Sequence, residues 1–285
     1  YMVRRTSALY VDFYKPLDIG YLKFVEDIIK NNLFDLIEVN YFDLITLADI
    51  LPDNIKKIFV HHELRYIKNN RELIAIKNHS IEDIYLKNYS KNIEIQHLLA
   101  YDAVVTMTEH DKLLLEKEFY KQVPVFASPA VVNLPENIQV GELADFNNKI
   151  VFLGGTNHYP NKEGFDWFIN NCWEKISEKN KNLILHVIGL WDEKTTAGYT
   201  SRFDNIVFRG YVDDLSAELR GSIMVIPINI GSGIRIKALD AIVNGVPIVA
   251  TSVGVEGLGM TDGVDAFIKD DADSFTQSLL ALASD

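Results

Sequence analysis

The sequence is poor in cysteine, and it contains no apolar run of the roughly 20 residues that a membrane-spanning helix requires. One cysteine, Cys172, among 285 residues excludes an internal disulfide framework and is typical of a protein in a reducing compartment. Cys172 lies in an apolar helical pattern, which favours a packed thiol over a reactive one. We therefore expect a cytoplasmic protein whose contact with a membrane is at most peripheral.

Positive charge is also scarce. The chain has 28 lysines and arginines against 40 aspartates and glutamates, a net charge of -12. This balance argues against a general nucleic-acid binder and against electrostatic adhesion to anionic lipid. An anionic ligand must therefore be held by a focused site with its own cations.

Strands and helices alternate regularly from Lys149 onward. The segments "KIVFLGG", "LILHVIG", "IVFRG", "IMVIPI" and "AFIKD" are predicted strands, and Pro247 opens another. Helices are predicted in "NKEGFDWFINNCWEKISEK", after Asp213-Asp214, after the stretch "GSGIR" and in "SFTQSLLALAS". Strands that are apolar throughout and alternate with helices indicate a parallel sheet covered on both faces. The second half is therefore predicted to be a Rossmann-like domain.

The first half alternates less cleanly. Its predicted strands are "FDLIEVN", "KKIFVHH", "DAVVTMT" and "VPVFAS", with a polar, largely helical insertion over residues 69–101. We expect an α/β protein with two Rossmann-like lobes: an N-terminal lobe over residues 1–132, a linker over 133–148 and a C-terminal lobe over 149–285. Two such lobes facing a central crevice would bind a ligand at the carboxyl ends of their strands.

A glycine loop follows the strand "VIPI" and opens a helix in "NIGSGIRIKALDAIVNG". The N-terminus of a helix is an anion site, and Gly231 and Gly233 allow the backbone to approach a ligand closely. Arg235 and Lys237 add full charges, while Asp240 suits a pair of sugar hydroxyls better than a phosphate. Cations for phosphates beside a carboxylate for a ribose indicate a nucleotide-diphosphate site.

The same loop is equally explained by solvated cations ahead of a packing helix, and spacing alone leaves both interpretations open. The chain contains neither a G-x-x-x-x-G-K-[ST] pattern nor a G-x-G-x-x-G pattern, which disfavours an ATPase or a dehydrogenase. "VDDL" at Val212 to Leu215 is better explained as a helix start than as metal ligands. We predict that no metal or other cofactor is required.

Three segments resemble one known family in order and spacing: "VFLGGTNHYPNKEGFDWFI", "VFRGYVDDL" and "VIPINIGSGIRIKALDAIVNGVPIVATSVGVEGL". They are similar to GT-B-fold glycosyltransferases of retaining family 4, the glycosyl transferases group 1. The resemblance covers nearly all of residues 149–285 and is weaker upstream, in "FDLIEVN", "VHHE" and "YDAVVTMTEHD".

The resemblance implies a nucleotide-sugar donor held mainly by the C-terminal lobe, and a sugar, lipid-linked or other hydroxyl acceptor held by the N-terminal lobe, as in polysaccharide biosynthesis. Gly154, Gly155 and Thr156 would lie near the donor phosphates and the reacting centre. The segment Arg209, Gly210, Tyr211 and Val212 would border the nucleobase. The diphosphate loop would comprise Gly231, Ser232, Gly233, Ile234, Arg235 and Lys237, and Asp240 would bind the ribose hydroxyls.

The chain departs from the family pattern in two places. Ser232 stands where many members have a glutamate that contacts the donor sugar, and Asp240 replaces a second glutamate. The start of the acceptor lobe is not matched, so we expect a first lobe that is incomplete.

His61 and His62 follow a strand whose carboxyl end would face the crevice. Adjacent residues of a strand point to opposite faces, so the two histidines are a poor metal pair. We expect His62 to be catalytic, because family members often carry a histidine near the donor sugar or acceptor. A nucleotide-sugar epimerase on the same fold, or a catalytically silent nucleotide-sugar-binding module, remains an alternative to a glycosyltransferase.

Overall fold

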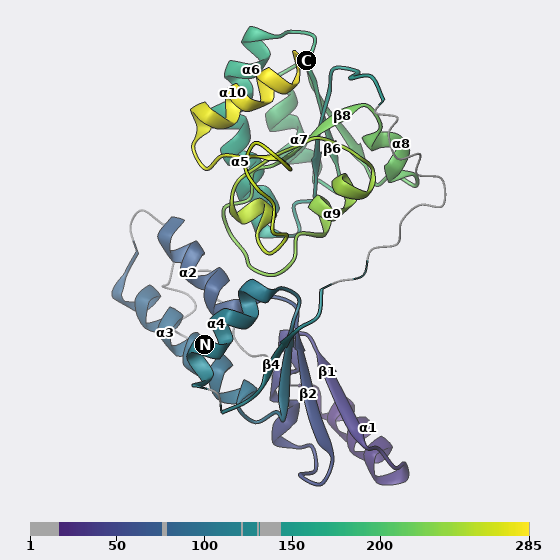
Figure 1. Ribbon diagram of the computed structural model, residues 1–285, viewed down its shortest axis with the longest axis vertical. Coiled ribbons are helices and arrows are strands. Elements are labelled where there is room, and N and C mark those ends of the chain that lie inside the picture. The colour runs from purple at the N-terminus through teal and green to yellow at the C-terminus, as the bar shows by residue number, and fades with distance from the viewer. Residues whose placement is uncertain (1–16, 76–78, 121, 130, 132–143, 285) are drawn as a thin grey trace. The chain divides into compact units, whose positions relative to one another are not determined.

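The computed structural model describes residues 17–75, 79–120, 122–129, 131 and 144–284 (Figure 1). Its contacts divide the chain into two compact units, residues 1–130 with 231–234, and residues 131–230 with 235–285. Residues 133–143 of the expected linker lie outside the described residues, and residues 144–147 have no regular secondary structure. Both units are α/β, as the sequence predicts.

The first unit contains a parallel sheet in the strand order β1-β2-β3-β4. Its strands are β1 (Leu36–Asn40), β2 (Lys56–His61), β3 (Ala103–Thr106) and β4 (Val125–Ala127). Each lies in one of the four segments in which the sequence predicts a strand. All four carboxyl ends therefore lie at one edge of this sheet.

Helices connect these strands: α1 (Ile19–Asn31), the 3-10 helix η2 (Phe42–Asp49), α2 (Arg65–Ala75), α3 (Ile81–Leu98) and α4 (Glu109–Phe119). The insertion expected over residues 69–101 is the end of α2 followed by α3. The Thr108 side chain accepts a hydrogen bond from the Asp111 N–H at the start of α4. This capping fixes the start of α4.

The core of the first unit is one cluster of buried residues that includes Phe59 on β2, Val104 on β3 and Leu115 on α4. Tyr101 closes the cluster, because its hydroxyl donates to the carbonyl oxygen of Ile45 at 2.9 Å.

The second unit contains a parallel sheet in the order β10-β9-β8-β5-β6-β7. Its strands are β5 (Lys149–Leu153), β6 (Ile184–Ile188), β7 (Ile206–Gly210), β8 (Ser222–Ile226), β9 (Ile248–Ala250) and β10 (Phe267–Ile268). The chain runs from β5 to β7 along one side of the sheet and then returns to place β8 on the other side of β5. Strand order thus reverses between β5 and β8, which is where open α/β sheets bind ligands.

Helices of the second unit are α5 (Tyr159–Phe168), the π-helical turn η3 (Ile169–Trp173), α6 (Glu174–Lys179), α7 (Glu193–Thr200), α8 (Leu215–Leu219), α9 (Ile236–Val243) and α10 (Ala272–Leu282). A short 3-10 turn, η4 (Val253–Val255), follows β9. The single helix predicted over 161–179 is thus interrupted by a π turn. Helix α7 was not predicted, because its sequence "EKTTAGYT" has one buried residue, Tyr199, and no apolar period.

Buried residues cover both faces of this sheet. Ile150 and Phe152 on β5 belong to a cluster with residues of α5, η3, α6 and α10, while Val151 belongs to a second cluster with residues of α8 and α9. In Figure 1, α5, α6 and α10 accordingly gather on one side of the sheet. Five apolar residues of the segment predicted as one helix over 161–179 are fully buried: Phe165, Phe168, Ile169, Cys172 and Ile176.

Cys172 is a packed thiol, as predicted. Its burial raises the pKa of the thiol to about 11. Within the described part of the chain, no helix combines the length and apolar character needed to cross a bilayer.

Candidate donor site and first-unit histidine

Backbone hydrogen bonds join the segments at the carboxyl ends of β5, β6 and β7 to one another. The Gly154 N–H donates to the carbonyl oxygen of Ile188 at 2.8 Å, and the Gly189 N–H donates to that of Gly210 at 2.8 Å. The Thr156 N–H donates to the carbonyl oxygen of Leu190 at 3.1 Å. The first glycine loop, Gly154–Thr156, is therefore held in place by its neighbours without any ligand.

Both glycines of this loop are required by close packing. Gly154 has φ 149°, and a Cβ there would lie 2.6 Å from Cγ of Asn161. A Cβ on Gly155 would lie 2.7 Å from the carbonyl oxygen of Leu190. Distances this short do not occur for real Cβ atoms, so a side chain at either position would displace the loop.

Trp191 supports the loop from the side of β6. Its indole Nε1 donates to the carbonyl oxygen of Gly154 at 2.7 Å. Its ring lies in an aromatic cluster, with ring centroids 4.8 Å from Phe165 and 5.6 Å from Phe208. Trp191 was not among the predicted site residues, although its place just beyond a predicted strand puts it at the same sheet edge.

The two predicted cations at the start of α9 differ in their surroundings. Arg235 is buried, and its Nε donates to the carbonyl oxygen of Val253 at 3.0 Å. Lys237 is half-buried, and its Nζ lies 5.2 Å from the centroid of the Phe152 ring. The Lys237 ammonium therefore lies over β5, beside the first glycine loop.

Burial and, to a smaller extent, the nearby charge of Arg235 together lower the pKa of Lys237 to about 7. A desolvated ammonium next to another cation is stabilised by an anion, so this position favours a negatively charged ligand.

Asn161 connects Lys237 to the first glycine loop. Its Oδ1 accepts a hydrogen bond from Lys237 Nζ at 2.7 Å, and its Nδ2 donates to the carbonyl oxygen of Gly155 at 3.2 Å. The adjacent Lys162 instead pairs with Asp166 within α5, at 2.9 Å. No feature of the local sequence marks Asn161, rather than one of its neighbours, as a residue of the site.

The segment Gly231–Ile234, predicted as part of the diphosphate loop, belongs to the first unit. The chain from Arg235 onward belongs to the second unit. Gly231 and Gly233 have φ values of 123° and 77°, so both positions favour glycine. Ser232 is buried. The role of this segment in phosphate binding stays a prediction.

Asp240 is half-buried on α9, one turn beyond Lys237. Burial raises the pKa of its carboxyl group. Hydroxyl donors of a ligand would favour the charged form and offset this effect. The ribose role of Asp240 stays a prediction.

The predicted nucleobase segment lies at the end of β7. Arg209 is paired with Glu218, with Nη2 2.6 Å from Oε1, and Gly210 has φ 68°. Tyr211 is 78% exposed, and Val212 is half-buried. Because the Arg209 guanidinium is already paired, the exposed Tyr211 ring and the backbone are the groups most accessible to a base.

The two adjacent histidines of the first unit point to different surroundings, as the alternation of a strand predicts. His61 is buried, and its Nε2 lies 2.8 Å from Oε1 of Glu94. His62 stacks on Tyr41, with ring centroids 4.3 Å apart. Glu94 also accepts from the backbone N–H groups of Arg65 and Tyr66, so His61 belongs to a structural cluster.

Hydrogen bonding assigns the tautomer of His62. Nδ2 of Asn40 donates to the Glu38 carboxylate at 2.8 Å, which turns Oδ1 of Asn40 toward Nε2 of His62 at 3.1 Å. An amide oxygen only accepts, so Nε2 carries the proton and Nδ1 is the acceptor. Burial and the neighbouring His61 lower the pKa of His62, which favours a neutral imidazole.

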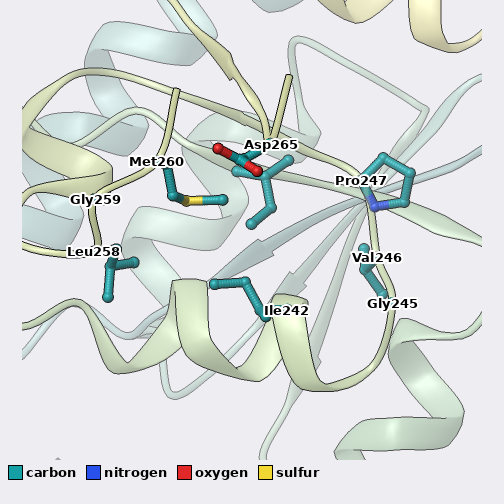
Figure 2. A pocket seen from close by; sticks show the side chains of 9 residues that line it. Ile242, Gly245, Val246, Pro247, Leu258, Gly259, Met260 and Asp265 are labelled. Atoms are coloured by element: carbon teal, nitrogen blue, oxygen red, sulfur yellow. The ribbon is translucent and has the colours of Figure 1, made fainter. Parts of the chain in front are cut away.

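A separate pocket of about 510 Å³ lies beside the C-terminal end of α9 (Figure 2). Ile242 on α9 faces Leu258 and Met260, and Asp265 is the one charged residue of the lining. The pocket lies beside the residues that precede β9, whereas Lys237 lies on the first turn of α9. An apolar pocket without a cation does not fit a diphosphate.

Among the described residues, no group of three or more histidine, cysteine, aspartate or glutamate side chains is arranged to hold a metal ion. The prediction that no metal is required remains to be tested by experiment.

Comparison with known proteins identifies the second half of the chain. Residues 147–285 match the family model of glycosyl transferases group 1. An uncharacterized 44.6 kDa protein in the cps region of Klebsiella pneumoniae is 26% identical over 142 residues, which cover 47% of this chain and 37% of that protein.

Solved structures extend the likeness to both halves. A structure of S. aureus TarM with UDP has a TM-score of 0.61 at 13% identity and covers 82% of this chain and 45% of that one. The pneumococcal O-GlcNAc transferase GtfA, solved with UDP and GlcNAc, has a TM-score of 0.60 at 15% identity, with 93% and 52% covered. A UDP-forming trehalose-phosphate synthase from Burkholderia vietnamiensis has a TM-score of 0.65 at 12% identity, with 93% and 68% covered.

The chain thus spans 37% of the curated relative and about half of the first two of these structures. At these identities the structures establish the fold. The family model, the two parallel α/β units and the GT-B neighbours agree: the chain has a GT-B fold, and its residues 147–285 match the family model of glycosyl transferases group 1.

Proposed function

We propose that this protein is a glycosyltransferase that moves a sugar from a nucleotide-diphosphate sugar to an acceptor hydroxyl, with retention. The observation that carries the proposal is the position of Lys237. Its desolvated ammonium lies beside the first glycine loop, at the point where strand order reverses in a group 1 glycosyltransferase domain. An anion bound there would stabilise the charged form of Lys237, which burial disfavours.

A uridine nucleotide is the donor to test first, because the TarM and GtfA structures contain UDP. For the acceptor we propose a sugar, lipid-linked or other hydroxyl compound of polysaccharide biosynthesis, which agrees with the cps region named for the Klebsiella relative.

Incubation of the full-length protein with a panel of UDP-, GDP-, ADP- and TDP-sugars, with and without sugar acceptors, tests the function. Release of nucleoside diphosphate that depends on an acceptor is expected, and the anomeric configuration of the product reports retention. A chelator such as EDTA should leave the rate unchanged if no metal is required.

Other outcomes identify the alternatives. A change in the donor sugar without transfer would indicate an epimerase. Binding of nucleotide sugar without either reaction would indicate a silent module, for which the replacement of the usual glutamate by Ser232 is the specific reason.

Asp240→Asn tests the ribose assignment, because it keeps the shape of the side chain and removes its charge. The variant should bind nucleoside diphosphate and nucleotide sugar about tenfold more weakly, since the ribose hydroxyls lose a charged acceptor. Calorimetric titration with a nucleotide and its 2′-deoxy analogue measures this loss. The deoxy analogue should already bind weakly to the wild type and change little on substitution, whereas unchanged binding with lost turnover would place Asp240 in the chemistry.

We propose that His62, held neutral by its surroundings, contacts the acceptor hydroxyl or the transferred sugar. His62→Ala should lower kcat about tenfold and leave the affinity for nucleoside diphosphate unchanged, because the lost hydrogen bond involves the reacting groups alone. Steady-state kinetics separate the two effects. His79→Ala, at an exposed position ahead of α3, is the matched control. A rise in donor KM without loss of kcat would move His62 to donor binding.

A further inference from the structure

We propose that Asn161 is a positioning residue of the donor site. Its side-chain amide links Lys237 to the first glycine loop, so that the ammonium group and the loop are already in place when a diphosphate binds. This inference rests on the proposed function. Asn161 itself need not touch the ligand.

The orientation of the Asn161 amide follows from its partners. An ammonium group only donates, so the atom 2.7 Å from Lys237 Nζ is the oxygen. The carbonyl of Gly155 only accepts, so the atom 3.2 Å from it is the nitrogen. Both ends of the amide are thus used, and a flipped amide would break both bonds.

The packing around the amide is equally specific. Gly154 has no Cβ, and a Cβ there would lie 2.6 Å from Asn161 Cγ, in the space that the amide occupies. The carbonyl oxygen of Gly154 is held from the other side by the Trp191 indole at 2.7 Å. The amide of Asn161 therefore fills a place that the glycine leaves for it.

Lys237 gains a fixed position from this arrangement. Its flexible stem carries the ammonium over the Phe152 ring at 5.2 Å, and Asn161 is its one side-chain hydrogen-bond acceptor among the described residues. Asn161 lies on the first turn of α5, whereas its side-chain bonds run to α9 and to the loop after β5. A residue serving only its own helix would bond within that helix.

A double-mutant cycle tests whether Asn161 acts through Lys237. Binding of UDP, GDP and ADP to the full-length protein is measured by calorimetry for wild type, Asn161→Ala, Lys237→Ala and the double variant. We expect Asn161→Ala to weaken binding of the preferred diphosphate about tenfold. In the Lys237→Ala background the same change should cost less than about twofold, because residues that act as one unit are not additive.

The pH profile provides a readout that a purely structural role would not change. Asn161→Asp keeps an acceptor for Lys237 and adds a negative charge, which favours the ammonium form. The decline in diphosphate affinity with rising pH should therefore begin at a higher pH in Asn161→Asp than in the wild type. This variant also keeps the test valid if Asn161→Ala does not fold.

Asn170→Ala is the matched control, because Asn170 accepts a bond from exposed Arg202 at 3.0 Å, away from the loop. Its affinity should equal that of the wild type. Wild-type-like binding by Asn161→Ala, equal losses in both backgrounds, or an unmoved pH profile in Asn161→Asp would each overturn the inference and leave the proposed function intact. If the wild type binds no nucleoside diphosphate, the proposed function fails, and the inference fails with it.

Discussion

Lys237→Ala should weaken the binding of nucleoside diphosphate by about ten- to a hundredfold and leave the fold intact. The substitution removes a charge-assisted hydrogen bond worth about 1.5–3 kcal/mol to the ligand. Because Lys237 is half-buried and its charged form is disfavoured in the free protein, the second unit loses little stability when the side chain is shortened. Calorimetry with the preferred diphosphate measures the loss.

The same experiment has a predicted pH dependence. With a pKa of about 7, Lys237 is largely neutral in the free protein above that pH, whereas a bound diphosphate favours the ammonium. Binding should therefore take up a proton, and affinity should fall up to about tenfold per pH unit above pH 7, until the pKa in the complex is passed. Terminal phosphates titrate near pH 6, so the range from 7.5 to 9 isolates the lysine.

Lys181→Ala, at an exposed position ahead of β6, controls for loss of net charge and should keep both the affinity and the pH dependence. Wild-type affinity in Lys237→Ala would return Lys237 to a structural role in α9. If the affinity of the wild type for diphosphate does not change between pH 7.5 and 9, the bound ligand does not stabilise the charged form of Lys237.

Phe165→Ala should destabilise the second unit by about 3–5 kcal/mol, the usual cost of removing a buried phenylalanine ring. Phe165 is fully buried, and its ring centroid lies 4.9 Å from that of Phe152 and 5.0 Å from that of Tyr199. Trp191, at 4.8 Å, is the residue that holds Gly154, so the cavity opens directly beneath the first glycine loop.

Urea denaturation followed by tryptophan fluorescence reports this loss selectively, because all three tryptophans, Trp167, Trp173 and Trp191, lie in the second unit. Val264→Ala, at a side chain that is 79% exposed, should change the free energy of unfolding by less than about 0.5 kcal/mol. A similarly small change in Phe165→Ala would mean that the aromatic cluster does not stabilise the unit.

Local sequence patterns were sufficient for most of the secondary structure. The strands of both sheets could be predicted from their apolar residues, most clearly β8, which is buried throughout. Phe165 and Ile176 follow a helical period. The π turn inside the predicted helix, and helix α7, were missed. A π turn adds a residue without altering the apolar pattern on either side, and α7 buries too little to show a period.

The residues of the candidate donor site also form two groups: those that can be found in the sequence and those that cannot. Glycines, cations and the carboxylate Asp240 can be found in sequence because their residue types carry the chemistry. Asn161 and Trp191 cannot, because each forms a hydrogen bond to a residue that is distant in sequence: Trp191 lies 37 residues from Gly154, and Asn161 lies 76 residues from Lys237.

The sequence by itself determined that this protein has two parallel α/β units, that its second half resembles a glycosyltransferase, and that Lys237 and Asp240 follow a glycine loop. Only the tertiary structure decided that β8 lies beside β5, which brings α9 to the first glycine loop. It also separated two adjacent histidines, since His61 is buried against Glu94 and His62 stacks on Tyr41. Alternation along a strand predicts that neighbours differ, but the side chains that surround each of them come from distant parts of the chain.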